Sequence, residues 1–291
     1  MKPGPGAAGS IAVARGDLQH HLAALAWLDV TAPLAREHLA LPSDLYLVTV
    51  YGDDGLECGP AQEPGGLQVL VSLLRTQPAP FRSHGQGRLA VALLTPAGLL
   101  KVLRAPLQGL ADRRLPLAQF CGVPEERRLR EQLLSTADAG ERVRRLGLWI
   151  ENRVHQRHGL GTPQRRTASA ASVLQQRGGA VDLTALAQQL AVTRRQLERD
   201  FQLWLGTSPA GYARLVRFQR AAALVCGGGR FLDAVFEHHY TDQSHLNRSF
   251  KAFSGLSPGE LAALASPPHR VQERAVLAGR VLMLDVPTRV L

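Results

Sequence analysis

The sequence predicts an α+β protein: a mixed or mainly β N-terminal domain with helices, followed by an all-α C-terminal domain. Two observations support this prediction. Short apolar runs of strand character gather between residues 41 and 104, among turn-forming glycines and aspartates. Near the C-terminus, a pattern of six residues recurs 49 positions later at identical mutual spacing, which predicts two copies of one small helical unit.

Three runs predict strands of the first domain, at residues 45–51, 67–71 and 89–94. The first run ends at Gly-Asp-Asp-Gly, residues 52–55, a sequence typical of a turn. Over residues 124–156 the pattern becomes helical, because apolar residues return at helical spacing. These apolar residues are Leu129, Leu133, Leu134, Leu146, Leu148 and Ile150.

Composition divides the chain into five segments. Residues 1–16 are rich in glycine, proline and alanine, and we expect them to be disordered. Residues 17–157 form the first domain, 158–175 a linker of glycine, proline and small residues, and 176–270 the paired helical domain. Residues 271–291 form an extension with strand-like alternation around 281–286, which either rejoins the first domain or serves a partner.

The net charge of +10 and the pI of about 10.5 favour an anionic partner, either nucleic acid or an acidic membrane surface. Three scattered cysteines, Cys58, Cys121 and Cys226, are too few for a disulfide framework or a four-ligand zinc site, so we expect the reducing cytoplasm. The most apolar run, residues 89–103, is interrupted by Pro96 and Lys101 and does not predict a membrane span. The N-terminus also lacks the hydrophobic stretch of a signal peptide.

Each copy of the repeat has a physical reason for its residues. Leucine and phenylalanine four positions apart share one buried helical face, and the arginine between them lies near the solvent edge. Glycine then ends that helix, and Ser-Pro begins the next one. The repeated residues are Leu197, Arg199, Phe201, Gly206, Ser208 and Pro209, and then Leu246, Arg248, Phe250, Gly255, Ser257 and Pro258. The unit is therefore helix, turn, helix.

The second helix of each unit has an exposed face that suits DNA. Before the first of these helices, Asp182 caps a short helix, and Thr193 with Gln196 forms a capping box. The exposed side chains offer donors and acceptors that match base edges and phosphates in a major groove. They are Arg194, Arg195, Glu198, Arg199 and Gln202 in the first unit, and Gln243, Ser244, Asn247, Arg248 and Lys251 in the second.

Residues 209–226 join the two units and read as one continuous helix that ends at three glycines. At about 1.5 Å per residue this helix is roughly 27 Å long. That length is close to the roughly 34 Å turn of B-DNA, which separates successive major-groove faces. The spacing indicates that one chain can reach two adjacent grooves.

These residues resemble the AraC/XylS family of transcriptional regulators, whose DNA-binding domain is two helix-turn-helix units joined by a long helix. The match rests on residues 183–209, 217–221 and 242–251, and on Gly-Leu-Ser-Pro at 255–258. The resemblance implies that Arg195, Glu198 and Arg199 face DNA in the first unit, and Ser244, Asn247 and Arg248 in the second. One departure is His239-Tyr240, where the family usually has Gly-Phe in a turn that favours a left-handed backbone.

The N-terminal half more weakly resembles the uncharacterised sensor-like domain of one branch of that family, through residues 91–98, 110–117 and 125–134. The resemblance implies that residues 17–157 sense a small molecule or dimerise. We therefore expect a transcription regulator with double-stranded DNA as its partner. RNA polymerase, a small-molecule effector and a second copy of the chain are further candidate partners, and we expect neither a cofactor nor membrane binding.

Three alternatives remain at this point. His20-His21, His238-His239 and His245 raise the question of a metal site, but adjacent histidines on a helix point apart. An enzyme fused to the DNA-binding domain is a second alternative, although three distant cysteines cannot supply a zinc-binding cluster. A third is a basic adaptor that binds an anionic membrane or a partner through the arginines of residues 127–166. We expect no enzyme activity.

Overall fold

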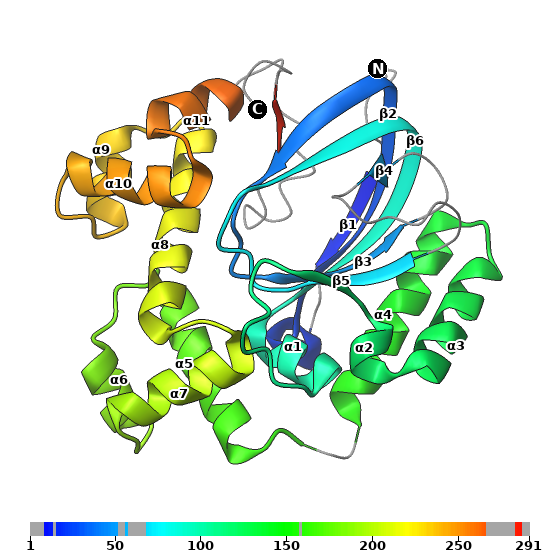
Figure 1. Cartoon of the computed structure of the whole chain (residues 1–291), viewed down its shortest axis with the longest axis horizontal. Helices are drawn as coiled ribbons and strands as arrows, with labels where there is room; N and C mark the ends of the chain where they lie inside the picture. The colour runs from blue at the N-terminus through cyan, green and yellow to red at the C-terminus, as the bar shows by residue number, and fades with distance from the viewer. Residues whose placement is uncertain are drawn as a thin grey trace.

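The computed structural model describes residues 9–13, 16–51, 56–57, 68–156, 159–265 and 283–286. In this part of the chain, a β-rich N-terminal region with helices precedes a C-terminal region built from helices (Figure 1). The predicted fold class is therefore confirmed. The turn predicted at residues 52–55 lies outside the described residues.

The strands formed by the described residues belong to one antiparallel sheet. They are β1 (Gly9–Val13), β2 (Leu22–Ala40), β3 (Tyr46–Tyr51), β4 (Leu56–Glu57), β5 (Gln68–Ser72), β6 (Ala79–Leu94), β7 (Arg114–Pro116) and β8 (Met283–Val286). Across the sheet the order is β1-β2-β6-β3-β5-β7, while β4 pairs with β6 and β8 pairs with β2. The sheet therefore includes the described residues of the C-terminal extension, whose strand β8 pairs with β2 of the first domain.

The sheet differs from the prediction mainly along β2 and β6. Strands β3, β5 and the second half of β6 coincide with the three predicted runs. The first half of β6 contains Pro80, Gly85 and Gly87, which locally disfavour a strand, and β2 was not predicted. These two strands pair along most of their length, so cross-strand pairing outweighs local preference. β1 lies inside residues 1–16, which were expected to be disordered, and pairs with β2.

Helices of the N-terminal region lie against this sheet (Figure 1). They are the 3-10 helix η1 (Gly16–His20) and the α-helices α1 (Pro96–Leu103), α2 (Ala118–Cys121), α3 (Val123–Leu134) and α4 (Ala139–His155). Four of the six predicted apolar positions of α3 and α4 are buried. The other two, Leu134 and Leu148, are 51% and 43% exposed, which corrects their assignment to the buried face.

The C-terminal region consists of helices, most of which pack against one long helix, α8. They are α5 (Thr162–Gln176), α6 (Leu183–Gln189), α7 (Arg194–Leu205), α8 (Pro209–Cys226), α9 (Phe231–Glu237), α10 (Gln243–Ser254) and α11 (Pro258–Ala265). Most of the segment expected to be a linker forms α5. This helix buries Ala170, Ala171 and Leu174, and it contacts α1, α7 and α8. Its buried face explains why the segment is ordered despite its small residues.

A buried ion pair fixes α5 to α7. Arg166 Nε donates to Asp200 Oδ2 at 2.8 Å, and Arg166 Nη2 donates to the same oxygen. Gln196 Nε2 donates to Asp200 Oδ1 at 2.6 Å, so both carboxylate oxygens accept hydrogen bonds. Asp200 is only 3% exposed, and its charge therefore depends on these partners for compensation.

A second polar cluster joins the N-terminal region to α5 and α8 at Asp44. Gln175 Nε2 donates to Asp44 Oδ2 at 2.7 Å, and Gln219 Oε1 accepts from the Asp44 backbone nitrogen at 3.3 Å. The Tyr212 hydroxyl donates to the Asp44 carbonyl at 3.2 Å. Three residues from two helices thus hold one turn of the N-terminal region in place.

We predict that Arg166→Ala destabilises the chain strongly, since it leaves the Asp200 carboxylate buried with one neutral donor. The expected loss in free energy of unfolding is about 2 to 4 kcal/mol. Urea unfolding followed by circular dichroism measures this loss. Arg194→Ala is the matched control, because its ion pair with Glu198 is exposed and should contribute no more than about 0.5 kcal/mol. Equal losses in the two variants would contradict the prediction.

Candidate nucleic-acid interface

The first helix-turn-helix unit consists of α6 and α7, and capping side chains define where each helix begins. Asp182 accepts a hydrogen bond from the Thr184 backbone nitrogen at 2.8 Å, and Thr193 accepts from the Gln196 nitrogen at 3.1 Å. The other half of the predicted capping box is wrong. The Gln196 side chain does not reach back to Thr193, because it is bound to Asp200 and to Arg199 Nη2.

All five positions predicted for the outward face of α7 are exposed: Arg194, Arg195, Glu198, Arg199 and Gln202. Arg194 Nε lies 3.1 Å from Glu198 Oε1, and Arg199 Nη2 donates to Gln196 Oε1 at 2.8 Å. Four of the five, Arg195, Glu198, Arg199 and Gln202, line a hollow of about 600 Å³ together with Gln196 and with Ser208 at the start of α8. The face therefore offers both donors and an acceptor to solvent.

The second unit consists of α9 and α10, and its predicted face is exposed as well. The exposed positions are Gln243, Ser244, Asn247, Arg248 and Lys251. Asp242 caps α10 by accepting from the His245 backbone nitrogen at 2.7 Å. This hydrogen bond is the largest cause of the lowered pKa of Asp242, and the positive charge of nearby Arg248 contributes less. Lys251 Nζ lies 3.0 Å from Glu260 Oε2, so its charge has an acidic partner at the start of α11.

The turns of the two units have the same conformation but different lengths. Ala191 and His239 both have φ of 55°, so His239 adopts the left-handed backbone that the sequence led us to expect. The next residue in each turn donates back across it, Val192 N to Ala187 O and Tyr240 N to Val235 O, both at 3.0 Å. In the first unit the helix cap, Thr193, follows Val192 directly. The second unit has one residue more, because Thr241 lies between Tyr240 and the helix cap, Asp242.

The repeat also ends as predicted in both copies. Gly206 and Gly255 end α7 and α10, each with φ of 74°. Ser208 accepts from the Gly211 nitrogen at 3.0 Å, and Ser257 accepts from the Glu260 nitrogen at 3.3 Å. A side chain at Gly206 would also meet Leu107 O at 2.6 Å. Glycine there permits close contact with the N-terminal region as well as the left-handed turn.

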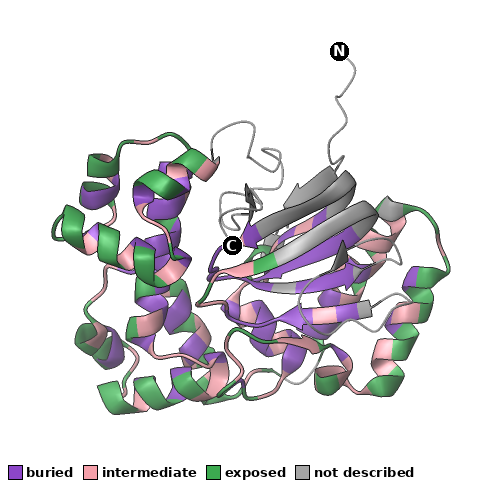
Figure 2. Ribbon diagram, turned by 45° about the horizontal axis from the view of Figure 1, so that its top comes forward, coloured by how far each residue is buried: buried purple, intermediate pink, exposed green. Residues whose placement is uncertain are grey.

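Helix α8 has the bounds that the sequence predicted and packs against both units. The Tyr212 ring lies 6.1 Å from that of Phe201 on α7, and the Phe218 ring lies 5.3 Å from that of Phe250 on α10. Phe253 stacks on Phe218 at 5.0 Å. The two units thus lie toward opposite ends of α8 (Figure 1), with exposed positions on their outer sides (Figure 2).

The structure also identifies residues that the sequence analysis missed. Arg166, Asp200 and Gln219 position the helices rather than face solvent. Arg166 lay in the expected linker, and a lone aspartate on a polar helix gives no signal of burial. Only the helical spacing of Asp200 with the buried Leu197 indicates in retrospect that it faces inward.

The alternative sites have little structural support. Within the described residues, no group of three histidine, cysteine, aspartate or glutamate side chains is arranged to hold a metal ion. Cys226 is buried and Cys121 half-buried, while Cys58 lies outside the described part. Among the helices of that part, none combines the length and apolarity that crossing a bilayer requires.

The paired units on one helix define the class of this region: a double helix-turn-helix domain. The family described as "Helix-turn-helix domain" matches residues 186–263. The C-terminal region is an AraC-type helix-turn-helix domain, as the sequence resemblance implied. Domains of this type bind DNA in transcription regulators. No curated protein matches the sequence.

Several solved structures are similar to the chain. ToxT from Vibrio cholerae O395 has a TM-score of 0.46 at 10% identity, covering 83% of this chain and 98% of that one. Wild-type ToxT from strain SCE256 bound to an unsaturated fatty acid gives 0.44 at 12%, covering 81% and 94%. The AraC-like transcriptional activator CuxR gives 0.23 at 14%, covering 79% and 91%.

We predict that His239→Gly stabilises the second unit, because glycine adopts the left-handed conformation without steric cost. The expected gain is about 0.5 to 1 kcal/mol after the greater entropy of the unfolded glycine variant is subtracted. Thermal unfolding followed by circular dichroism checks it. His239→Ala is the control, since it removes the exposed side chain but keeps the strained backbone, and it should change little. A lower midpoint for the glycine variant would show that the imidazole makes a stabilising contact.

Proposed function

We propose that this chain is a sequence-specific transcription regulator that reads two adjacent major grooves of duplex DNA with α7 and α10. The observation that supports this most is a duplication: α7 and α10 each have an exposed polar face, and they pack at two places along one 18-residue helix, α8. At about 1.5 Å per residue, that helix spans roughly 27 Å, near the roughly 34 Å repeat of the major groove. The net charge of +10 favours association with the phosphate backbone.

In this proposal, each recognition helix combines base readout with phosphate contacts. Arg195 and Asn247 suit guanine and adenine edges, and Glu198 suits the amino group of cytosine. Arg199, Ser244 and Arg248 would contact bases or phosphates. Arg194 and Lys251 now pair with Glu198 and Glu260, so they would exchange those partners for phosphates. Gln243 completes the face of α10.

We further propose that the N-terminal domain modulates DNA binding, through a small molecule or through dimerisation. Support comes from the hydrogen bonds of Asp44 to α5 and α8, which connect that domain to the scaffold of both units. Helix α5 belongs with the DNA-binding domain in this view, because it packs on α7 and α8. The boundary between the domains then falls before Thr162. RNA polymerase remains a proposed partner.

The test begins with selection of bound sequences from a random duplex library by the full chain. We predict that Arg195→Ala and Asn247→Ala each weaken binding to the selected site by about 1 to 3 kcal/mol. Affinity for random duplex should hardly change. Gel-shift titration on both duplexes measures the two effects.

Arg127→Ala, an exposed arginine on α3, is the matched control and should leave both affinities unchanged. Equal loss on selected and random duplex would rule out base readout at Arg195 and Asn247. Failure of the wild-type chain to enrich any sequence would overturn the proposed function itself.

Arg248 gives a separate prediction, based on phosphate contact. If its guanidinium neutralises one phosphate, Arg248→Ala should make the logarithm of affinity less dependent on the logarithm of salt concentration, by about one unit of slope. Titrations at several salt concentrations measure that slope. If the salt dependence is unchanged but the variant no longer distinguishes the selected duplex from random duplex, Arg248 contacts a base instead of a phosphate.

A further inference from the structure

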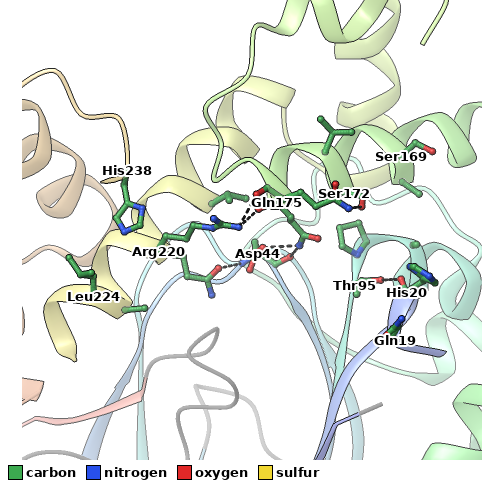
Figure 3. A pocket seen from close by; sticks show the side chains of 18 residues that line it. Gln19, His20, Asp44, Thr95, Ser169, Ser172, Gln175, Arg220, Leu224 and His238 are labelled. Atoms are coloured by element: carbon green, nitrogen blue, oxygen red, sulfur yellow. Dashed lines mark hydrogen bonds between the residues drawn. The ribbon is translucent and has the colours of Figure 1, made fainter. Parts of the chain in front are cut away.

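A cavity of about 1040 Å³ lies where the N-terminal region meets α5, α8 and the end of α9. Its walls include Thr95 at the start of α1, Ser172 and Gln175 on α5, Arg220 on α8 and His238 after α9 (Figure 3). Cavities that bind small molecules commonly measure about 300 to 1,000 Å³. The size therefore suits a metabolite, and the cavity touches α5 and α8, which pack against the two helix-turn-helix units.

Polar side chains outnumber apolar ones in the lining of this junction cavity. Eleven of its eighteen lining residues have polar side chains, and the apolar ones are mostly small. A long hydrocarbon chain would desolvate these polar groups without replacing their hydrogen bonds. The lining therefore favours a compact occupant that itself has many hydrogen-bonding groups.

The lining carries one permanent positive charge, on Arg220, which can attract an anion, and one negative charge, on Asp44. Arg220 and His238 lie at one end and His20 at the other, with Asp44 and Gln175 between them (Figure 3). Asp44 contributes the one carboxylate among these lining residues, and Gln175 Nε2 donates to it at 2.7 Å. A guanidinium recognises carboxylate and phosphate groups through paired donors. His238 Nε2 is buried and makes no hydrogen bond to the described residues, while its side chain lines the cavity.

One chain of hydrogen bonds links the cavity wall to both regions. Arg220 Nη2 donates to the Gln175 carbonyl oxygen, and the Gln175 side chain donates to Asp44. An anion that draws the Arg220 guanidinium toward itself competes with the Gln175 carbonyl for that donor. The contact between α8 and the C-terminal end of α5 would then change, and with it the support of both recognition helices.

We propose that the junction cavity binds a small, multiply charged anion with phosphate or carboxylate groups, and that its binding alters the affinity of the chain for DNA. Only the claim about DNA affinity rests on the proposed function. The claim that the cavity binds an anion is measured without DNA. A ligand shifts DNA affinity only insofar as it prefers one arrangement of the domains over another.

Isothermal titration calorimetry with the full chain tests the first half, with inorganic pyrophosphate and citrate as probes at constant ionic strength. We expect saturable one-to-one binding of at least one probe and no binding of the neutral polyol sorbitol. Arg220→Gln should weaken binding at least about tenfold, as loss of a charge-assisted hydrogen bond implies. Arg214→Gln, an exposed arginine of the same helix outside the cavity lining, is the matched control and should bind as the wild type does.

His238→Gln provides a second test that does not depend on Arg220, whose guanidinium also supports the end of α5. It should weaken binding of the same probe by several-fold, and circular dichroism confirms that each variant is folded. Saturable binding of neither probe would overturn the proposal. Equal weakening by Arg214→Gln and Arg220→Gln would do so too, because it would indicate attraction to a generally basic surface.

Gel shifts on the selected duplex, with and without the bound probe, test the second half. The probe should change the affinity of the wild-type chain at constant ionic strength and leave Arg220→Gln unaffected. An equal response in both proteins would overturn the coupling. If the chain selects no duplex at all, the proposed function fails, while the calorimetric result on the cavity stands separately.

Discussion

The packing of helix α8 is the constraint on which the rest of the molecule depends. Tyr212 illustrates it, since its ring contacts Phe201 of the first unit while its hydroxyl donates to Asp44 of the N-terminal region. Farther along, Phe218 contacts Phe250 and Phe253 of the second unit. Because side chains of one rigid element touch three neighbours, none of the three can change position without disturbing contacts on α8. Both recognition helices therefore depend on one shared core.

The contacts around α8 differ in kind. The two units meet it through fully buried aromatic rings, whose separation would expose apolar surface. The N-terminal region meets it partly through hydrogen bonds at Asp44, and water can replace such bonds at small net cost when the surfaces separate. Rearrangement between the two regions is thus easier than rearrangement within the DNA-binding domain. The regulation proposed for this junction would need correspondingly little free energy.

The sequence predicted the C-terminal region far better than the N-terminal one, and the reasons are physical. Caps such as Asp182 and Thr193, and the terminating glycines, act locally, so they place helix ends within a residue. Strand β2 and the first half of β6 depend on each other across the sheet, and neither has a strong local signal. The outward faces of α7 and α10 followed from helical spacing. In contrast, the Arg166–Asp200 pair and the Asp44 cluster join residues far apart in sequence, which spacing cannot reveal.

The extra residue in the turn of the second unit, together with the different side chains on α7 and α10, has a consequence for the DNA. Under the proposed function, the two recognition helices of one chain are related by duplication but are not equivalent, so a duplex that both read would have two distinguishable ends. Reversing such a site would present each groove to the wrong reader. A single copy of this protein would therefore be oriented on its site, with its N-terminal domain always toward the same side of a neighbouring promoter.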